Sequence, residues 1–299
     1  MNVPPVDIPR IQGLRSRLHR RAHRLTEADL DRRTMVFAPH PEDESLGCGG
    51  TILQKRCHGI PVDLVFMTDG HRSHGRLFGA DRLVAIREKE ALAAAEDLGC
   101  DSEAVHFLRY ADGALSDSFD AAIEAVTALL IDRQPNDIFL PLANDGPSDH
   151  EVTFDIVIAA LRRCGRPVRV HEYPIWFWAR WPWVRLRIRP KRTGLRTWFE
   201  PNTAILGLPT MRRLTSAVFI GNLIDRKRAA LFCHQSQVSS LNGDPDWPVL
   251  QDIAGGDFLD CFFHDVELFA SWTYEPGSDH RSPLSQSDIA SPQTTECHV

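Results

Sequence analysis

Short apolar runs alternate along the chain with longer segments in which apolar residues recur every three or four positions. The runs predict buried strands, and the periodic segments predict amphipathic helices. The expected strands are residues 35–38, 62–68, 105–108, 137–142 and 168–173. The expected helices are residues 45–58, 81–98, 120–133 and 151–163. Gly99 is expected to end the second helix, because glycine readily adopts the left-handed conformation found at helix C-termini.

Strands that alternate with helices through short connections indicate βαβ units. We therefore expect an α/β fold: a Rossmann-like, mostly parallel sheet with helices on both faces. In such sheets, ligands bind beyond the carboxyl ends of the strands. The loops expected at that edge are residues 40–44, 69–74, 110–112 and 144–150. Functional side chains are therefore expected in these loops.

The two ends of the chain fall outside this alternation. Residues 11–30 carry several arginines and predict a basic surface helix, within an N-terminal extension of residues 1–33. Residues 34–275 are expected to form the main domain. Residues 276–299 are rich in Ser, Pro, Asp and Thr, so they can bury little and predict a flexible tail.

A Trp/Arg-rich insertion at about residues 175–210 also interrupts the pattern. Within it, residues 185–189 alternate basic and apolar side chains, as in a strand with one solvated face. We favour a β-hairpin whose tryptophans pack on the core. Two alternatives stay open: a surface for an acidic or lipid-linked substrate at a membrane, and an aromatic and basic surface for nucleic acid.

Composition narrows the class of protein. The 299 residues are 43% hydrophobic and 25% charged, which excludes a mainly disordered chain. The formal net charge of −6 argues against a polyanion binder, so no nucleic acid is expected. No apolar run approaches the ~18 residues that a membrane-spanning helix needs. The seven cysteines form no C-x-x-C pair, which fits a reducing, cytoplasmic location without a thiolate zinc site.

The turn after the first expected strand concentrates ionisable side chains. They are His40, Glu42, Asp43 and Glu44. The cluster is repulsive unless a cation neutralises it, and imidazole together with carboxylate suits Zn²⁺. A catalytic zinc takes three protein ligands and a water, and His150 offers a ligand from the end of another strand. We expect Asp149 to orient a histidine, and Glu44 to orient the turn or cap the following helix.

Motifs spread over roughly residues 34–270 agree with one known pattern. They are His40-Pro-Glu-Asp-Glu44, Thr68-Asp69-Gly70, Arg87-x-x-Glu90, Tyr110-x-Asp112-Gly113, Asp149-His150, Glu172-Tyr173-Pro174 and His234-x-Ser236-Gln237. Together they resemble the PIG-L/LmbE-like family of zinc-dependent N-deacetylases, whose pattern is an A-H-P-D-D-E turn followed later by H-P-D-H. Each motif is weak alone, but their joint occurrence is specific.

The resemblance implies a function and a set of site residues. It implies that His40, Asp43 and His150 bind Zn²⁺, with another divalent metal such as Fe²⁺ as an alternative. It implies that Glu42 is the general base, that Arg87 lies near the substrate or the released acetate, and that Asp112 contacts the sugar ring. The implied reaction removes acetyl from an N-acetylglucosamine-like sugar or glycoconjugate, by attack of a zinc-bound hydroxide on the amide.

Two positions depart from the family pattern. Glu42 replaces Asp and is one methylene longer, although a carboxylate keeps the role if it reaches the attacking water. Pro147 replaces the first His of H-P-D-H, which in the family stabilises the tetrahedral intermediate or protonates the amine. His71 or His74 could substitute from another strand-end loop. Two alternative functions stay open: an amidase acting on another N-acyl small molecule, and a catalytically impaired carbohydrate-binding member.

Overall fold

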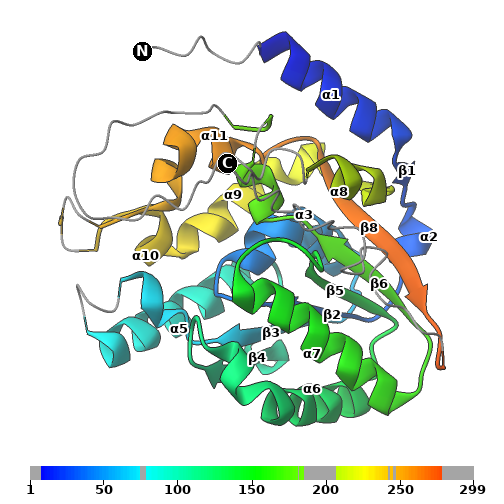
Figure 1. Ribbon diagram of the computed structural model, residues 1–299, viewed down its shortest axis with the longest axis vertical. Helices are drawn as coiled ribbons and strands as arrows, with labels where there is room; N and C mark the ends of the chain where they lie inside the picture. The colour runs from blue at the N-terminus through cyan, green and yellow to red at the C-terminus, as the bar shows by residue number, and fades with distance from the viewer. Residues whose placement is uncertain are drawn as a thin grey trace, which may run out of the picture.

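The computed structural model describes residues 8–74, 79–180, 182–184, 207–241, 243–244 and 247–277, without the side chains of 8–12 and 207–209. Its centre is an eight-stranded sheet of order β1-β7-β8-β6-β5-β2-β3-β4 (Figure 1). The strands are β1 His23–Arg24, β2 Thr34–Ala38, β3 Val62–Thr68, β4 Val105–Tyr110, β5 Asp137–Pro141, β6 Val168–Tyr173, β7 Ser216–Phe219 and β8 Val266–Tyr274. Only β8 runs antiparallel to its neighbours, β6 and β7. The expected mostly parallel α/β sheet is confirmed.

Helices cover both faces of the sheet. The α-helices are α1 Ile8–Arg21, α2 Glu27–Leu30, α3 Asp43–Cys57, α5 Ala80–Asp97, α6 Phe119–Arg133, α7 Ser148–Cys164, α8 Gly207–Arg213, α9 Ile224–Cys233, α10 Gln235–Val238 and α11 Asp257–Asp260. Short 3₁₀ turns include η1 His71–Ser73 and η4 Trp176–Ala179. Figure 1 shows α6 and α7 side by side on one face, while α3, α5 and α9 contribute to the core on the other.

Strand β2 shows how the sequence pattern builds these two layers. Because successive side chains of a strand point to opposite faces, Val36 and Ala38 enter one hydrophobic cluster while Met35 and Phe37 enter the other. All four side chains are buried, as expected for a central parallel strand. The neighbours β5 and β3 flank β2 in register, so the loops that follow all three strands meet at one edge.

The helix expected over residues 11–30 is wrong in extent. Helix α1 ends at Arg21, and β1 then pairs in parallel with β7. The short helix α2 begins anew after Thr26, whose Oγ1 accepts a hydrogen bond from the Asp29 backbone N–H. This cap satisfies backbone N–H groups at the start of α2, which would have no need of a cap in a continuous helix. Between α1 and α2, the backbone forms hydrogen bonds with β7 in place of helical hydrogen bonds.

The Trp/Arg-rich insertion is described only in part. In that part, residues 176–179 form the 3₁₀ turn η4. The expected β-hairpin stays a prediction, because most of the insertion lies outside the described residues. Phe177, Trp178 and Trp183 are buried, and the Arg15 guanidinium of α1 lies 5.8 Å from the Trp178 ring centroid. These aromatic side chains therefore pack on the core, as expected.

Other expectations stay untested. The expected strand at residues 185–189 and all but the first two residues of the expected tail lie outside the described residues. The proposed domain boundaries stay predictions. Within the described ranges, no helix is both long and apolar enough to cross a membrane.

Candidate metal centre and active site

The turn between β2 and α3 has an unusual backbone. Glu42 adopts φ 116° and ψ −26°, a conformation that is costly for a residue with a side chain. The turn is nevertheless held from several sides. Thr68 donates to the Pro39 carbonyl through both its backbone N–H (3.0 Å) and its hydroxyl (2.8 Å). The His40 backbone N–H donates to Asp43 Oδ2 at 3.0 Å. The surrounding bonds therefore maintain a strained turn that carries the ionisable cluster.

Three side chains from this turn and from α7 converge on one point. His40 Nδ1 lies 3.3 Å from Asp43 Oδ2, and His150 Nε2 lies 3.4 Å from the same oxygen. One ligand atom of each residue lies within 4.8 Å of the others. His150 is fully buried, and neither its Nε2 nor its Nδ1 has a hydrogen-bond partner among the described residues. A buried polar atom without a partner is costly, so the arrangement fits a metal-binding site with two imidazoles and one carboxylate.

The second nitrogen of each imidazole lies close to a carboxylate. His40 Nε2 lies 3.2 Å from Asp112 Oδ1 and 3.3 Å from Asp149 Oδ2. Asp145 Oδ2 lies 3.0 Å from His150 Nδ1. Each histidine thus directs one nitrogen toward Asp43 and the other toward a carboxylate. Such partners select the tautomer of a metal-binding histidine and raise its basicity.

The acidic surroundings change the titration of His40. Burial opposes its protonation, but Asp112, Asp149 and Asp43 outweigh burial and raise the pKa of His40 well above its ordinary value. Conversely, burial would raise the pKa of Asp112, but the hydrogen bond with His40 lowers it to about 2. The site therefore favours positive charge at its centre.

Glu42 and Arg87 form a buried pair beside the three converging side chains. Arg87 Nη2 donates to Glu42 Oε2 and, at 2.9 Å, to the Pro41 carbonyl, while Nη1 donates to the Gly70 carbonyl. Burial raises the pKa of Glu42 to about 7, although the charge of Arg87 opposes this effect. Arg87 is only 2% exposed, and its contacts with Glu42 and the Pro41 carbonyl fix the Glu42 side chain.

Glu44 stabilises the same turn through other hydrogen bonds. Its carboxylate accepts hydrogen bonds from the Glu42 backbone N–H (3.0 Å) and the Ser45 hydroxyl (2.6 Å). His234 Nε2 lies 2.8 Å from Glu44 Oε1. Glu44 therefore holds the backbone that presents Glu42.

Comparison with known proteins finds a similarity to one family over part of the chain. Residues 35–161 match the model of the family described as PIG-L: GlcNAc-PI de-N-acetylase. Over this segment the chain is similar to the PIG-L/LmbE-like family. The matched segment contains the turn at His40, the Arg87 helix, Asp112 and the loop that ends at His150.

Curated relatives align over most of the chain. It is 26% identical over 283 residues to a 1D-myo-inositol 2-acetamido-2-deoxy-alpha-D-glucopyranoside deacetylase of Mycobacteroides abscessus, covering 83% of this chain and 94% of the relative. It is 27% identical over 255 residues to a probable N-acetyl-alpha-D-glucosaminyl L-malate deacetylase 2 of Bacillus cereus, covering 82% and 99%. The fold is similar to N,N'-diacetylchitobiose deacetylase from Pyrococcus horikoshii, with a TM-score of 0.57, 21% identity and coverage of 89% and 93%.

Glu42 and Pro147, the two residues that depart from the PIG-L pattern, lie in different structural environments. Glu42 stays beside the converging ligands despite its extra methylene, held there by Arg87. Pro147 is the N-cap residue of α7, with φ −63° and ψ 143°, and its carbonyl accepts from the His150 backbone N–H at 3.1 Å. That position therefore contributes a backbone acceptor and no imidazole.

Asp145 is a residue of the candidate site that sequence reasoning missed. It is fully buried, and its carboxylate accepts backbone hydrogen bonds from residues 175, 176 and 177 in addition to facing His150. An acidic residue within the loop at 144–150, shortly after a buried strand, was the available signal. Nothing local distinguishes it from Asp149, because its backbone partners come from the segment that follows β6.

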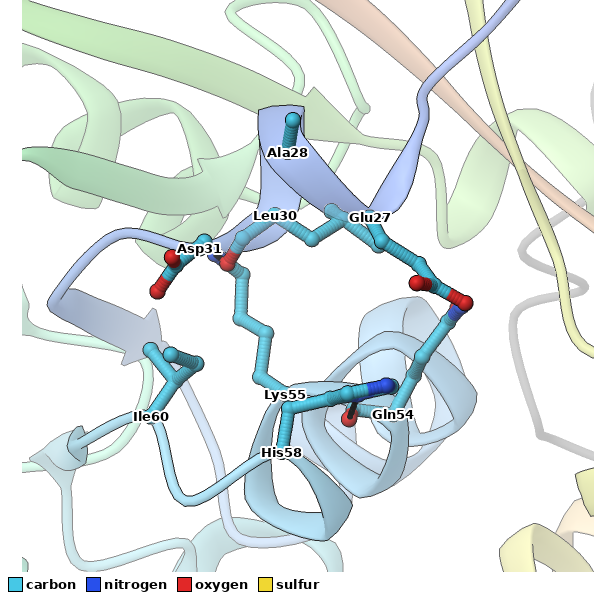
Figure 2. Close-up of a pocket in the computed structure, with 8 residues that line it drawn as sticks. All are labelled: Glu27, Ala28, Leu30, Asp31, Gln54, Lys55, His58 and Ile60. Atoms are coloured by element: carbon cyan, nitrogen blue, oxygen red, sulfur yellow. Dashed lines mark hydrogen bonds between the residues drawn. The ribbon is translucent and has the colours of Figure 1, made fainter.

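A hollow lies at the other end of α3, away from the candidate metal centre. It measures about 280 Å³ between α2 and the end of α3, as Figure 2 shows. Its lining residues are Glu27, Ala28, Leu30, Asp31, Gln54, Lys55, His58 and Ile60. Lys55 Nζ is already engaged by the Leu30 carbonyl at 2.8 Å and Asp137 Oδ2 at 3.1 Å. The lysine is therefore a structural ion-pair partner, and this hollow is separate from the metal centre.

Proposed function

We propose that this chain is a zinc-dependent N-deacetylase that hydrolyses the acetamide of an N-acetylglucosamine-like sugar or glycoconjugate. The observation that carries the proposal is the convergence of His40, Asp43 and His150, with a carboxylate behind each imidazole. The substrate class is supported by the names of relatives that align over most of the chain.

The residues present fit a divalent metal. His40, Asp43 and His150 would hold it, since no described residue forms a hydrogen bond with the buried Nε2 of His150. A metal bound by two imidazoles and one carboxylate supplies Lewis-acid chemistry for amide hydrolysis. Zinc suits this donor set, and Fe²⁺ is the alternative that the same ligands accept.

Glu42 is proposed as the general base. Arg87 donates a hydrogen bond to Glu42 Oε2, and no described residue donates to Glu42 Oε1. That oxygen is free to accept a proton from the attacking water, while Arg87 prevents the longer side chain from rotating away. Because general-base catalysis depends on alignment, we propose that Arg87 acts on the reaction through Glu42. Its contact with substrate or released acetate stays a prediction.

Asp112 is proposed to contact the sugar ring. Its Oδ1 faces His40, and its Oδ2 accepts a hydrogen bond from the Arg72 backbone N–H at 2.8 Å. The side chain is 10% exposed, so one edge is accessible at the carboxyl ends of the strands. A carboxylate fixed in this way can accept a hydrogen bond from a sugar hydroxyl without moving.

The proposal is tested by metal content and acetate release together. The purified protein is assayed with N-acetylglucosamine, diacetylchitobiose and an N-acetylglucosaminyl inositol, measuring both acetate and free amine. His150→Ala should lose metal and activity, whereas His58→Ala, at the exposed end of α3, should retain both. Acetate release from other N-acyl compounds alone would support the amidase alternative. Sugar binding without any acetate release would support the carbohydrate-binding alternative.

A further inference from the structure

The loop before α7 lacks a proton donor where the PIG-L pattern has a histidine. Pro147 stands at that position and is part-buried. The adjacent Asp149 is directed to His40 and accepts from the Gly113 backbone N–H at 2.6 Å. This loop therefore offers the substrate no imidazole, and a replacement must come from a neighbouring strand end.

Two other imidazoles near this edge of the sheet, those of His74 and His234, are buried and already have partners. His74 is 2% exposed, its Nδ1 lies 2.8 Å from Ser73 Oγ, and its Nε2 lies 2.6 Å from the Pro248 carbonyl oxygen. Its ring also stacks on Trp247 at 4.2 Å. His234 is fully buried against Glu44. Both rings are therefore structural.

His71 differs from them in exposure and in its partner. Its side chain is 31% exposed, and its Nδ1 lies 2.7 Å from Asp69 Oδ1. No described residue lies within hydrogen-bond distance of its Nε2. A ring oriented at one nitrogen by a carboxylate and open at the other is the arrangement of a histidine that transfers protons.

Backbone hydrogen bonds connect the His71 turn to the metal centre. Asp69 Oδ1 also accepts from the backbone N–H groups of His71 and Asp112, each at 3.2 Å. Asp112 in turn accepts from the Arg72 N–H and faces His40. Since β3 lies between β2 and β4 in the sheet (Figure 1), the turn after β3 is next to the turn that carries His40.

We propose that the Asp69–His71 pair supplies the imidazole that Pro147 no longer provides, and that His71 Nε2 contacts the departing nitrogen of the acetamide. This inference rests on the proposed deacetylase function. Water adds to the carbonyl carbon and gives one proton to Glu42. The imidazolium of His71 gives its Nε2 proton to the amide nitrogen as the C–N bond breaks, which yields acetic acid and the free amine. The neutral ring then regains a proton from solvent, and Glu42 releases its own.

The test is His71→Gln, with His106→Gln as a matched control. His106 also faces an aspartate, with Nε2 3.3 Å from Asp63 Oδ1, but it lies at the start of β4, at the opposite end of the strands. His71→Gln should lower kcat about 10²-fold, the lower range for a lost general acid, with KM and metal content unchanged. His106→Gln should behave as the unmodified protein.

Restoring the family residue provides a second measurement. Pro147→His should raise kcat at least tenfold in the His71→Gln background and change it little in the unmodified protein, because the two imidazoles would do the same work. The Pro147 backbone angles are open to any residue, so the variant should fold.

The outcomes separate this inference from the proposed function. Acetate release by the unmodified protein, with equal kcat for His71→Gln, would overturn the role of His71 alone. Loss of metal in His71→Gln, or an equal gain from Pro147→His in both backgrounds, would also overturn it. An unmodified protein that binds metal but releases no acetate from any N-acetyl compound would overturn the proposed function, and this inference with it.

Discussion

Asp145 Oδ2 lies 3.0 Å from His150 Nδ1, and both side chains are completely buried. The relationship matters because His150 points its other nitrogen at Asp43. Asp145 is itself immobilised by backbone donors from the segment that follows β6. The orientation of the histidine is thus connected through one carboxylate to the η4 turn.

Asp145→Asn should weaken metal binding about 10- to 100-fold, because a neutral amide no longer fixes the tautomer and basicity of His150. Zinc affinity is measured by competition with a chromophoric chelator. Asp132→Asn, at a surface carboxylate that is 70% exposed, is the control and should bind zinc normally. Equal affinities for both variants would remove Asp145 from the metal centre.

Glu42→Gln should retain zinc and lose about 10²- to 10⁴-fold in kcat, because the amide preserves the shape of the side chain but accepts no proton. Glu42→Asp, which restores the family residue, should keep most of the turnover. Metal analysis and steady-state acetate release check both variants. Normal turnover in Glu42→Gln would exclude this residue as the base.

Lys227→Met should destabilise the fold by about 3–5 kcal/mol, because it leaves the buried Glu267 charge without its partner. Lys227 Nζ lies 2.7 Å from Glu267 Oε1 and donates to the Leu46 carbonyl at 2.8 Å. The free energy of unfolding is measured by urea denaturation. Arg226→Met, at an exposed position on the same helix, should cost less than 1 kcal/mol, as is usual at the surface. A similar loss in both would contradict the prediction.

Acidification should destabilise the protein through His171. Burial lowers the pKa of His171 to about 4, from 6.5 in an unfolded chain, and its ring stacks on Phe139 at 4.6 Å. Between these pKa values the unfolded state binds more protons, so stability falls as the pH falls from about 6.5 toward 4. The full loss is about 3 kcal/mol at 1.36 kcal/mol per pKa unit.

The measurement for His171 is the free energy of unfolding across this pH range. His171→Gln keeps a polar group near Ser271 Oγ, which lies 2.7 Å from His171 Nδ1, but does not titrate. Its stability should therefore depend less on pH than that of the unmodified protein. Parallel pH profiles for the two proteins would show that other groups cause the acid sensitivity.

Local pattern was sufficient for the elements that carry the site. The apolar run after residue 34 and the run at 62–68 became β2 and β3, because a strand buried on both faces needs continuous apolar sequence. The turn at His40 and the loop at His150 were recognisable because the end of a parallel strand is where such clusters function.

Contacts between residues far apart in the sequence determined the features that local pattern did not predict. Nothing near Arg21 shows that β1 will pair with β7 and end the first helix, and nothing near Arg87 shows that its guanidinium will be buried beneath Glu42. Sequence by itself determined the α/β alternation and the candidate ligands, because both depend on the chemistry of neighbouring residues. Only the tertiary structure decided which carboxylate faces which imidazole, because those partners lie on different strand-end loops that meet only when the sheet forms.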